Sequence, residues 1–296
     1  MKHADRARAN RSGIVAMIAA VGFLSLMDGG LKALAAHYPP VQVTALRAIA
    51  SLPIVVAWIA WRRGFGQLLR VRWPLHLLRG VLGVGMLSLF AYALKRLPLA
   101  DAYSIFFVAP LLITALSVPI LGERVDARRW IAIAVGLGGV LIVLKPTGEG
   151  MFTLAGLAVL GAAMAYAITA ITMRVLSRTD GTQAMMFWLT TMMAIGAGAL
   201  AAPHWVAVRA SDWPVIAGIA VTGALGQYAI TEAFSRAEAS VVAPFEYTAL
   251  AWGLGLDWFV WGVAPQLRML AGAAVIIAAG VYLVHRERVH VEAEHP

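Results

Sequence analysis

Apolar residues run along this chain in long stretches, interrupted at regular intervals by short groups of polar residues, glycine and proline. Each stretch is close to the about 20 residues that an α-helix needs to cross the hydrocarbon core of a membrane. Turn-forming residues at 38–40, 146–150 and 180–181 separate neighbouring stretches. The pattern predicts ten membrane-spanning helices, at residues 13–36, 41–61, 74–94, 98–121, 128–145, 152–174, 183–202, 213–235, 239–261 and 266–285.

The composition supports an all-α polytopic membrane protein. Of the 296 residues, 61% are hydrophobic and only 13% are charged, which is far from the balance of a soluble domain. The chain has no cysteine, which excludes disulfides and thiolate metal sites, and its seven histidines follow no metal-binding spacing. We therefore expect no metal, no cofactor and no catalytic residues.

The distribution of positive charge indicates the orientation of the chain in the membrane rather than binding to a polyanion. The net charge is +9, but most lysines and arginines lie in short loops on the side of the predicted N-terminus. This asymmetry predicts cytoplasmic N- and C-termini and no binding of nucleic acid. The basic start and the sequence 33–35 also imitate a secretory signal, but the apolar run is too long for one and contains Asp28 and Lys32. We therefore assign it as the first span.

An internal repeat divides the chain into two halves. Leu121-Gly122 matches Trp261-Gly262 at an offset of 140, and the segment 93–96 matches 233–236 at the same offset. Each half has five spans, and because five is odd, the second half must insert with the opposite orientation. The predicted organisation is a cytoplasmic N-terminal segment (1–12), a first five-helix repeat (13–146), an inverted second repeat (152–286) and a cytoplasmic tail (287–296). Inverted repeats are typical of secondary transporters, whose substrate site lies near the midplane.

Several motifs in this order carry a family resemblance. They are Leu46-Arg47, the run 94–110 leading into Leu121-Gly122-Glu123, Gly139-Val140, and the segment 239–247. Together they resemble the EamA-type transporters of the drug/metabolite transporter superfamily. The resemblance implies a ten-helix carrier of small organic solutes, frequently an exporter in bacterial inner membranes, with amino-acid exporters as one branch. Val263 departs from the pattern, because the second half usually repeats Gly-Glu there; any role of that acid is left to Glu123.

Two charged residues inside predicted spans are candidates for the substrate site. Arg47 either braces neighbouring helices through backbone carbonyls or forms an anion-attracting wall of a central cavity. Glu246 follows Pro244, which removes a backbone donor and predicts a local break in the ninth span. The Glu246 carboxyl group suits proton coupling or binding of an ammonium group, with a structural pairing to Arg47 as the alternative.

Asp28 and Lys32 lie four residues apart on one helical face, where they either neutralise each other or act separately. Aromatic residues away from the span ends supply apolar walls with polar groups, against the alternative that they serve helix packing. The predicted substrate-binding residues are Asp28, Lys32, Arg47, Tyr92, Tyr103, Trp188, Tyr228 and Glu246. We expect the cavity between the first, third, fourth, sixth, eighth and ninth spans.

These features favour a carrier that works by alternating access in the membrane lipid, as a monomer. A zwitterion needs one acidic and one basic group, so neutral or aromatic amino acids are the favoured cargo. An exporter of lipophilic cations or drugs is the alternative within transport. An intramembrane lipid-modifying enzyme would need a nucleophile or base, for which His76 is the one histidine near a span, and nothing in the sequence resembles the selectivity ring of a channel.

Overall fold

The computed structural model describes residues 3–62, 65–94, 96–97, 99–144, 153–262, 264 and 266–292, and within these residues the protein is α-helical with short 3-10 turns and no strand. The helices are α1 (His3–Ala35), α2 (Pro40–Trp61), α3 (Trp73–Leu94), α4 (Leu99–Phe106), α5 (Ala109–Leu121), α6 (Ala127–Leu144), α7 (Leu154–Leu176), α8 (Thr182–Ala201), α9 (Trp213–Arg236), α10 (Ala239–Val242), α11 (Thr248–Trp261) and α12 (Leu267–Glu292). The 3-10 turns are η1 (Phe65–Gln67), η2 (Ala202–His204), η3 (Ala210–Asp212) and η4 (Ala243–Tyr247).

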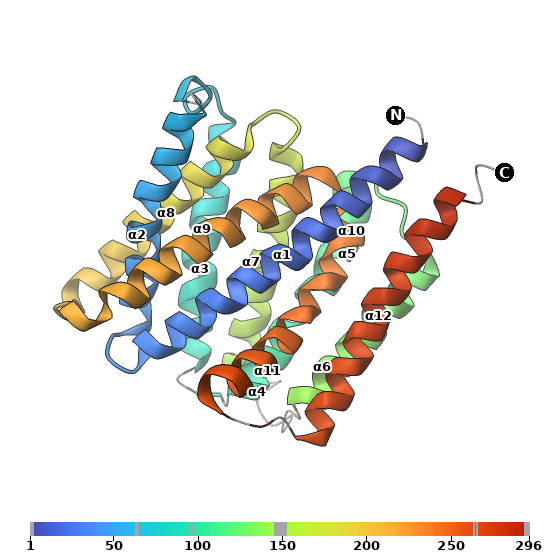
Figure 1. Cartoon of the computed structure of the whole chain (residues 1–296). Coiled ribbons are helices and arrows are strands. Elements are labelled where there is room, and N and C mark those ends of the chain that lie inside the picture. The colour runs from blue at the N-terminus through green and yellow to red at the C-terminus, as the bar shows by residue number, and fades with distance from the viewer. Residues whose placement is uncertain are drawn as a thin grey trace.

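These elements form ten passes in the described residues, which confirms the predicted all-α polytopic fold. Eight helical stretches are long and apolar enough to cross a membrane. The remaining two passes are the segment from α10 to α11, which is interrupted by η4, and α12, whose apolar part is the shorter stretch Leu267–Leu283. Figure 1 shows the N-terminal end of α1 and the C-terminal end of α12 on the same side of the bundle. We call this the termini side.

The outermost helices are longer than predicted. α1 begins at His3, before the predicted start of the first span at residue 13, and α12 continues to Glu292, beyond residue 285. Both extensions contain several arginines, together with alanine in the first and glutamate in the second, and these residues favour helix even where no membrane surrounds them. Val263 and the predicted boundary between the halves at 146–152 lie outside the described residues.

The two halves have equivalent local geometry at equivalent positions. Gly122 ends α5 with φ of 70°, and Gly262 follows α11 with φ of 68°. These are the left-handed helix ends that glycine adopts without strain, and they stand at the offset of 140 that the sequence repeat predicted. Five passes carry the chain from one side to the other, so the second half runs with the opposite orientation.

Helix packing follows the same symmetry. α1 lies along α9, and its equivalent in the second half, α7, lies along α3. α2 packs against α8 and α6 against α12, which are pairs of equivalent helices. The α2–α8 pair and the α6–α12 pair stand at opposite ends of the bundle in Figure 1, with the crossing helices between them. The centre of the molecule is therefore built by both halves.

The fourth and ninth passes are both interrupted. The ninth leaves the α-helix at η4, which contains Pro244, as the sequence predicted. The fourth is interrupted by a turn at Phe107 and Val108, just before Pro110, and this interruption was not predicted. The two interruptions meet, because Phe107 and Tyr247 are in ring contact with centroids 6.1 Å apart.

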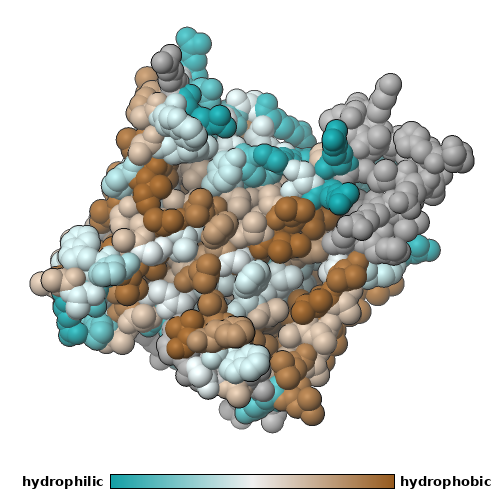
Figure 2. All heavy atoms as spheres, in the orientation of Figure 1, coloured by the Kyte–Doolittle hydropathy of each residue, from teal (hydrophilic) through white to brown (hydrophobic). Residues whose placement is uncertain are grey.

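The outer surface suits a lipid environment. Large apolar side chains are exposed along the helices, among them Val81 (70% exposed) and Phe259 (83%). On the face drawn in Figure 2, apolar side chains cover the middle and hydrophilic ones gather towards the edges. In water such a surface would be unfavourable, whereas hydrocarbon tolerates it as long as backbone groups are paired within helices.

Candidate substrate cavity

A cavity of about 260 Å³ lies between both halves. Its wall is made by α1, α2 and α3 of the first half and α7, α8 and α9 of the second. The residues that line it are Leu24, Met27, Asp28, Thr44, Arg47, Ala48, Ser51, Gly83, Met86, Tyr166, Thr169, Met173, Leu189, Thr190, Met193, Gly223, Ala224, Gln227 and Ile230. Most of this surface is apolar, with a few hydroxyl, amide and charged groups, which is typical of a site for a small organic molecule.

The helices around the cavity differ in part from the prediction. The first, third, sixth and eighth passes line it as expected, but the second and seventh take the places predicted for the fourth and ninth. The reason is the packing of the interrupted passes. α5 packs against α7 and α11 against α1, while α2 and α8 pack against each other at the other end of the bundle.

Asp28 and Arg47 give the cavity one acidic and one basic group. In the part of the chain that the structure describes, neither side chain forms a hydrogen bond or an ion pair within 4 Å. The electrostatic partner of Asp28 is Arg47, not Lys32, which is exposed in the last turn of α1. The Arg47 side chain lies beside Gly223 of α9, where a Cβ would be in ordinary van der Waals contact with Arg47 Nε, at 3.6 Å. Both charges are therefore available to a solute.

Glu246 lies behind the cavity wall rather than in it. The Tyr166 hydroxyl group, on a residue that lines the cavity, donates a hydrogen bond of 3.1 Å to Glu246 Oε1. Glu246 belongs to η4, so this bond links the interrupted ninth pass to the wall. The alternative that Glu246 pairs with Arg47 is not what the structure shows, because its hydrogen-bond partner is Tyr166.

The other predicted aromatic residues hold helices together outside the cavity wall. The Tyr92 ring lies 3.9 Å below the Arg96 guanidinium, and Tyr103 stacks edge-on with Phe90 at 5.6 Å. Trp188 donates its indole N–H to the Leu68 carbonyl at 2.9 Å, and Tyr228 contacts Trp58 with ring centroids 5.4 Å apart. None of these four residues is among those that line the cavity, although Tyr103 lies close enough to Asp28 to interact with it electrostatically.

Other lining residues were not among the predicted site residues. Thr44 and Ser51 stand three residues before and four residues after the predicted Arg47, so the three form one polar stripe on α2. That stripe could have been found from the sequence. Four methionines also line the wall, at positions 27, 86, 173 and 193. Methionine is flexible and fills irregular space, so these positions carried no sequence signal beyond apolar character.

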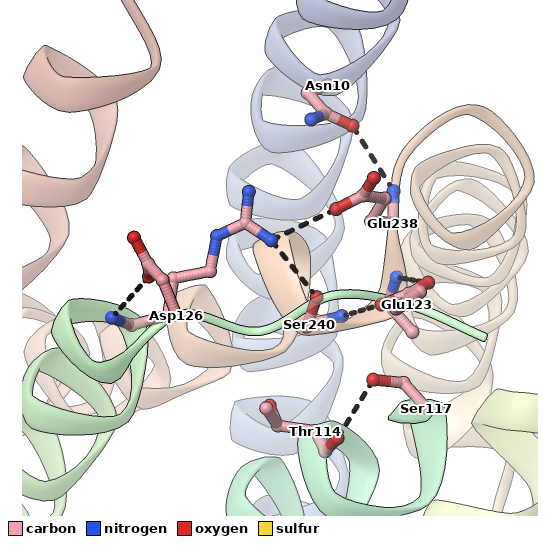
Figure 3. Close-up of polar contacts among 9 residues, drawn as sticks. Asn10, Thr114, Ser117, Glu123, Asp126, Glu238 and Ser240 are labelled. Atoms are coloured by element: carbon pink, nitrogen blue, oxygen red, sulfur yellow. Dashed lines mark hydrogen bonds and ion pairs between the residues drawn. The ribbon is translucent and has the colours of Figure 1, made fainter. Parts of the chain in front are cut away.

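On the termini side, a polar cluster joins the two halves (Figure 3). Glu123 Oε1 and Oε2 accept the backbone N–H groups of Ala239 (2.8 Å) and Ser240 (2.9 Å). Arg129 Nη1 donates to Glu238 Oε2 at 3.0 Å, and the Glu238 N–H donates to Asn10 Oδ1 at 3.3 Å. These bonds tie α1, the segment after α5, α6 and the start of α10 to one another, which closes this side of the bundle.

A second buried pair, on the same side, joins the first turn of α3 to the α7–α8 connection. His76 Nε2 is 2.8 Å from Asp180 Oδ2, and both side chains are almost fully buried. Burial alone would raise the pKa of Asp180, but hydrogen bonds from Thr179, His76 and the Arg72 backbone N–H hold that pKa below its usual value. His76 thus has a structural partner that ties α3 to the second half.

Comparison with known proteins decides the family. The EamA-like transporter family matches residues 11–145 and 153–286, which together cover nearly the whole chain. The chain belongs to the EamA-like transporter family. It is a multi-pass membrane transporter of small metabolites and not an enzyme, and the predicted membership of the drug/metabolite transporter superfamily is confirmed.

Named EamA relatives carry different solutes. The chain is 27% identical over 275 residues to the pseudopaline exporter CntI of Pseudomonas aeruginosa, covering 92% of this chain and 96% of the relative. It is 31% identical to a riboflavin transporter of Vibrio cholerae (84% of each chain) and 27% identical to an S-adenosylmethionine uptake transporter of Rickettsia bellii (81% of each). A solved crystal structure, 20% identical, superimposes with a TM-score of 0.81 over 96% of this chain and 99% of that one, which supports the fold. Family membership alone therefore does not determine the cargo.

Proposed function

We propose that this EamA-family carrier exports neutral or aromatic amino acids across the bacterial inner membrane by alternating access. The observation that carries the proposal is the pairing of Asp28 and Arg47 on the wall of one cavity, each without a close partner. Asp28 binds the ammonium group of the solute, Arg47 binds its carboxylate, and the surrounding methionine and leucine side chains contact its apolar side chain.

The size of the cavity supports a cargo of this class. A volume of about 260 Å³ is below the roughly 300–1,000 Å³ of sites for drug-sized ligands. An amino acid fits such a space without rearrangement of the helices. A charge inside a membrane is unfavourable by at least about 2.5 kcal/mol. Asp28 and Arg47 interact electrostatically but form no close ion pair, so they favour a solute that binds both.

The proposal also covers the orientation of the chain in the membrane and its working unit. The excess of lysine and arginine on the termini side supports cytoplasmic termini, and we propose that the two repeats at 13–146 and 152–286 move against each other. One chain supplies both halves of the site, so the working unit is a monomer. Glu246 is the group that we assign to proton coupling, through its hydrogen bond with Tyr166 on the cavity wall.

The test uses purified protein in proteoliposomes and three related solutes: leucine, its decarboxylated analogue isopentylamine, and its deaminated analogue 4-methylpentanoate. A hydrogen bond to a charged group contributes about 1.5–3 kcal/mol, so loss of one side chain changes affinity roughly 10- to 100-fold. We expect Arg47→Gln to raise the KM for leucine and to leave inhibition by isopentylamine unchanged. Asp28→Asn should raise the KM for leucine and leave inhibition by 4-methylpentanoate unchanged.

The control is Arg124→Gln, which removes an exposed arginine from the loop after α5 and should not alter transport. The assignment of a zwitterionic cargo is wrong if the wild-type protein does not exchange leucine. It is also wrong if Arg47→Gln weakens the binding of leucine and of isopentylamine equally.

A second candidate is export of lipophilic cations, which the four methionines of the wall favour because flexible thioether side chains adapt to varied apolar solutes. Such a cargo needs Asp28 but has no use for Arg47. Efflux of tetraphenylphosphonium that is lost in Asp28→Asn and unchanged or faster in Arg47→Gln would support this candidate over amino-acid export.

A further inference from the structure

Arg79 of α3 is a buried cation without adequate compensation. Its side chain is 1% exposed, and it is the largest of the fully buried side chains in the described chain. Its Nε and Nη2 atoms have no hydrogen-bond partner, and its Nη1 reaches only the Met185 carbonyl, at 3.5 Å. That distance is beyond the usual 2.7–3.2 Å range for such a bond. The guanidinium is therefore almost unsatisfied in this conformation.

Nearby acidic groups do not explain this arginine. Asp180, in the connection at the same end of α3, already accepts hydrogen bonds from His76, Thr179 and the Arg72 backbone. Among the described residues, no ion pair involves Arg79. Burying a charge without a partner is strongly unfavourable, so such a residue is usually compensated in another state of the protein.

The position of Arg79 relates it to the cavity. Arg79, Gly83 and Met86 are spaced four and three residues apart, so they share one face of α3, and the last two line the cavity. On the neighbouring α8, the Met185 carbonyl lies one turn before Leu189, which also lines the cavity. Arg79 thus lies about one helical turn, or about 6 Å, below the cavity towards the termini side.

Arg79 and Arg47 lie at similar depths from opposite sides of the bundle. Arg47 is seven residues from the start of α2, which begins on the side away from the termini. Arg79 is six residues from the start of α3, which begins on the termini side. At a rise of about 1.5 Å per residue, these depths are about 10 Å and about 9 Å along the helices. In the present conformation Arg47 faces the cavity and Arg79 does not.

The contact between α3 and α8 beside Arg79 is made by flexible side chains. A Cβ on the adjacent Gly80 would lie 2.5 Å from Met192 Sδ, and one on Gly83 would lie 2.9 Å from Met193 Sδ. α3 and α8 therefore meet through glycine surfaces and flexible methionine side chains. Methionine changes rotamer easily, and the hydrogen bond from Arg79 to the Met185 carbonyl is long, at 3.5 Å, so little opposes separation of these helices at this contact.

We propose that Arg79 is a second carboxylate-binding residue, which faces the solute when the carrier opens towards the termini side, as Arg47 faces it in the present conformation. This inference rests on the proposed transport of a carboxylate-bearing solute. The carboxylate passes from one guanidinium to the other as the halves rock, and each arginine is compensated in the state in which it meets the solute. Burial of Arg79 with its Nε and Nη2 unsatisfied is then a property of one half of the transport cycle.

The first test is side-specific labelling, for which the natural absence of cysteine provides a clean background. Arg79→Cys is reconstituted in vesicles and exposed on one side at a time to an impermeant sulfonate thiol reagent. We expect labelling from the termini side only. Ala48→Cys, on the cavity wall, should label from the opposite side, and Ile133→Cys, which is 0% exposed between α6 and α12, should label from neither.

The second test measures leucine KM separately for each side. Arg79→Gln should raise the KM on the termini side by about tenfold or more and leave the opposite KM unchanged, and Arg47→Gln should do the reverse. Arg79→Gln should also be at least as heat-stable as the wild type, because it removes an uncompensated buried charge. Arg79→Lys should restore part of the affinity.

The outcomes separate this inference from the cargo assignment. No labelling at position 79, or lower heat stability of Arg79→Gln with both KM values unchanged, would show a purely structural arginine and overturn the inference. If wild-type vesicles do not exchange leucine, the amino-acid proposal fails. Labelling of Arg79→Cys from the termini side alone would still support a binding residue in the path of another anionic solute.

Discussion

The carboxylate of Glu123 joins the two halves on the termini side. It is 7% exposed, and its two oxygens accept the first two N–H groups of α10 from the other half. The start of a helix presents unpaired N–H groups and a partial positive charge, so a carboxylate there is favourable. Glu123→Gln tests how much this contact contributes to stability.

The expected loss can be worked out from the two bonds. In Glu123→Gln, the amide oxygen still accepts one N–H, whereas the amide NH₂ group faces the other N–H and cannot accept it. The change removes one charge-assisted hydrogen bond, leaves one buried N–H without a partner and takes the charge from the other bond. Together these amount to about 2–4 kcal/mol. For a chain of this size, we expect the Tm in detergent to fall by about 5 °C or more.

Asp126→Asn is the matched control. Asp126 Oδ1 accepts the Arg129 backbone N–H at 3.0 Å, which makes it a cap within its own half, and Asp126 is exposed. Asparagine caps helices about as well as aspartate, so this variant should stay within about 0.5 kcal/mol of the wild type.

A second measurement, the reactivity of a buried cysteine, tests whether the termini side is closed to solvent. Ser117 is fully buried beside the cluster, and its hydroxyl donates to the Thr114 carbonyl at 2.8 Å. Ser117→Cys should be unreactive towards thiol reagents in the wild-type background and reactive when combined with Glu123→Gln. An unchanged Tm and an unreactive cysteine in the combined variant would refute the assignment of Glu123 as the contact that holds this side closed.

Further predictions concern helix packing, pH and the neighbouring ion pair. Gly139→Ala places a Cβ 2.9 Å from a backbone carbonyl of α12 and should cost about 1–3 kcal/mol in thermal unfolding, whereas Gly138→Ala meets nothing within 4 Å and should be neutral. Because the pKa of Asp180 in the folded protein lies below that of an ordinary aspartate, its contribution to stability is complete above about pH 4 and is lost as the pH falls through the folded pKa. Asp180→Asn should therefore lower the Tm at neutral pH and flatten its decline below pH 4; equal acid sensitivity in both proteins would contradict this. In a double-mutant cycle, Arg129→Gln and Glu238→Gln should each destabilise the protein and show a coupling energy of about 0.5–3 kcal/mol, and strict additivity would argue against their ion pair.

Individual residues show how much of the site could be predicted from the sequence. Arg47 could be singled out because a charge inside an apolar helix is costly, and the structure places it on the cavity wall. Asp28 was equally visible, but its pairing with Lys32 was an inference from helical spacing within α1, whereas its electrostatic partner Arg47 comes from α2. Tyr103 and Trp188 were chosen as polar aromatics away from span ends, and the structure uses them to hold helices together.

The sequence by itself determined the ten passes, the two-fold repeat and the interruption at Pro244, because hydrophobic length, glycine at a left-handed helix end and proline act locally. Only the tertiary structure decided that α2 and α8 line the cavity, that Tyr166 separates Glu246 from it, and that Arg79 is buried with two of its nitrogen atoms unsatisfied. In hydrocarbon all apolar faces of a helix are nearly equivalent, so hydrophobicity carries little information on which face meets another helix. The choice of face is made by close packing of small residues and by a few polar contacts between distant segments, and neither is visible in one helix alone.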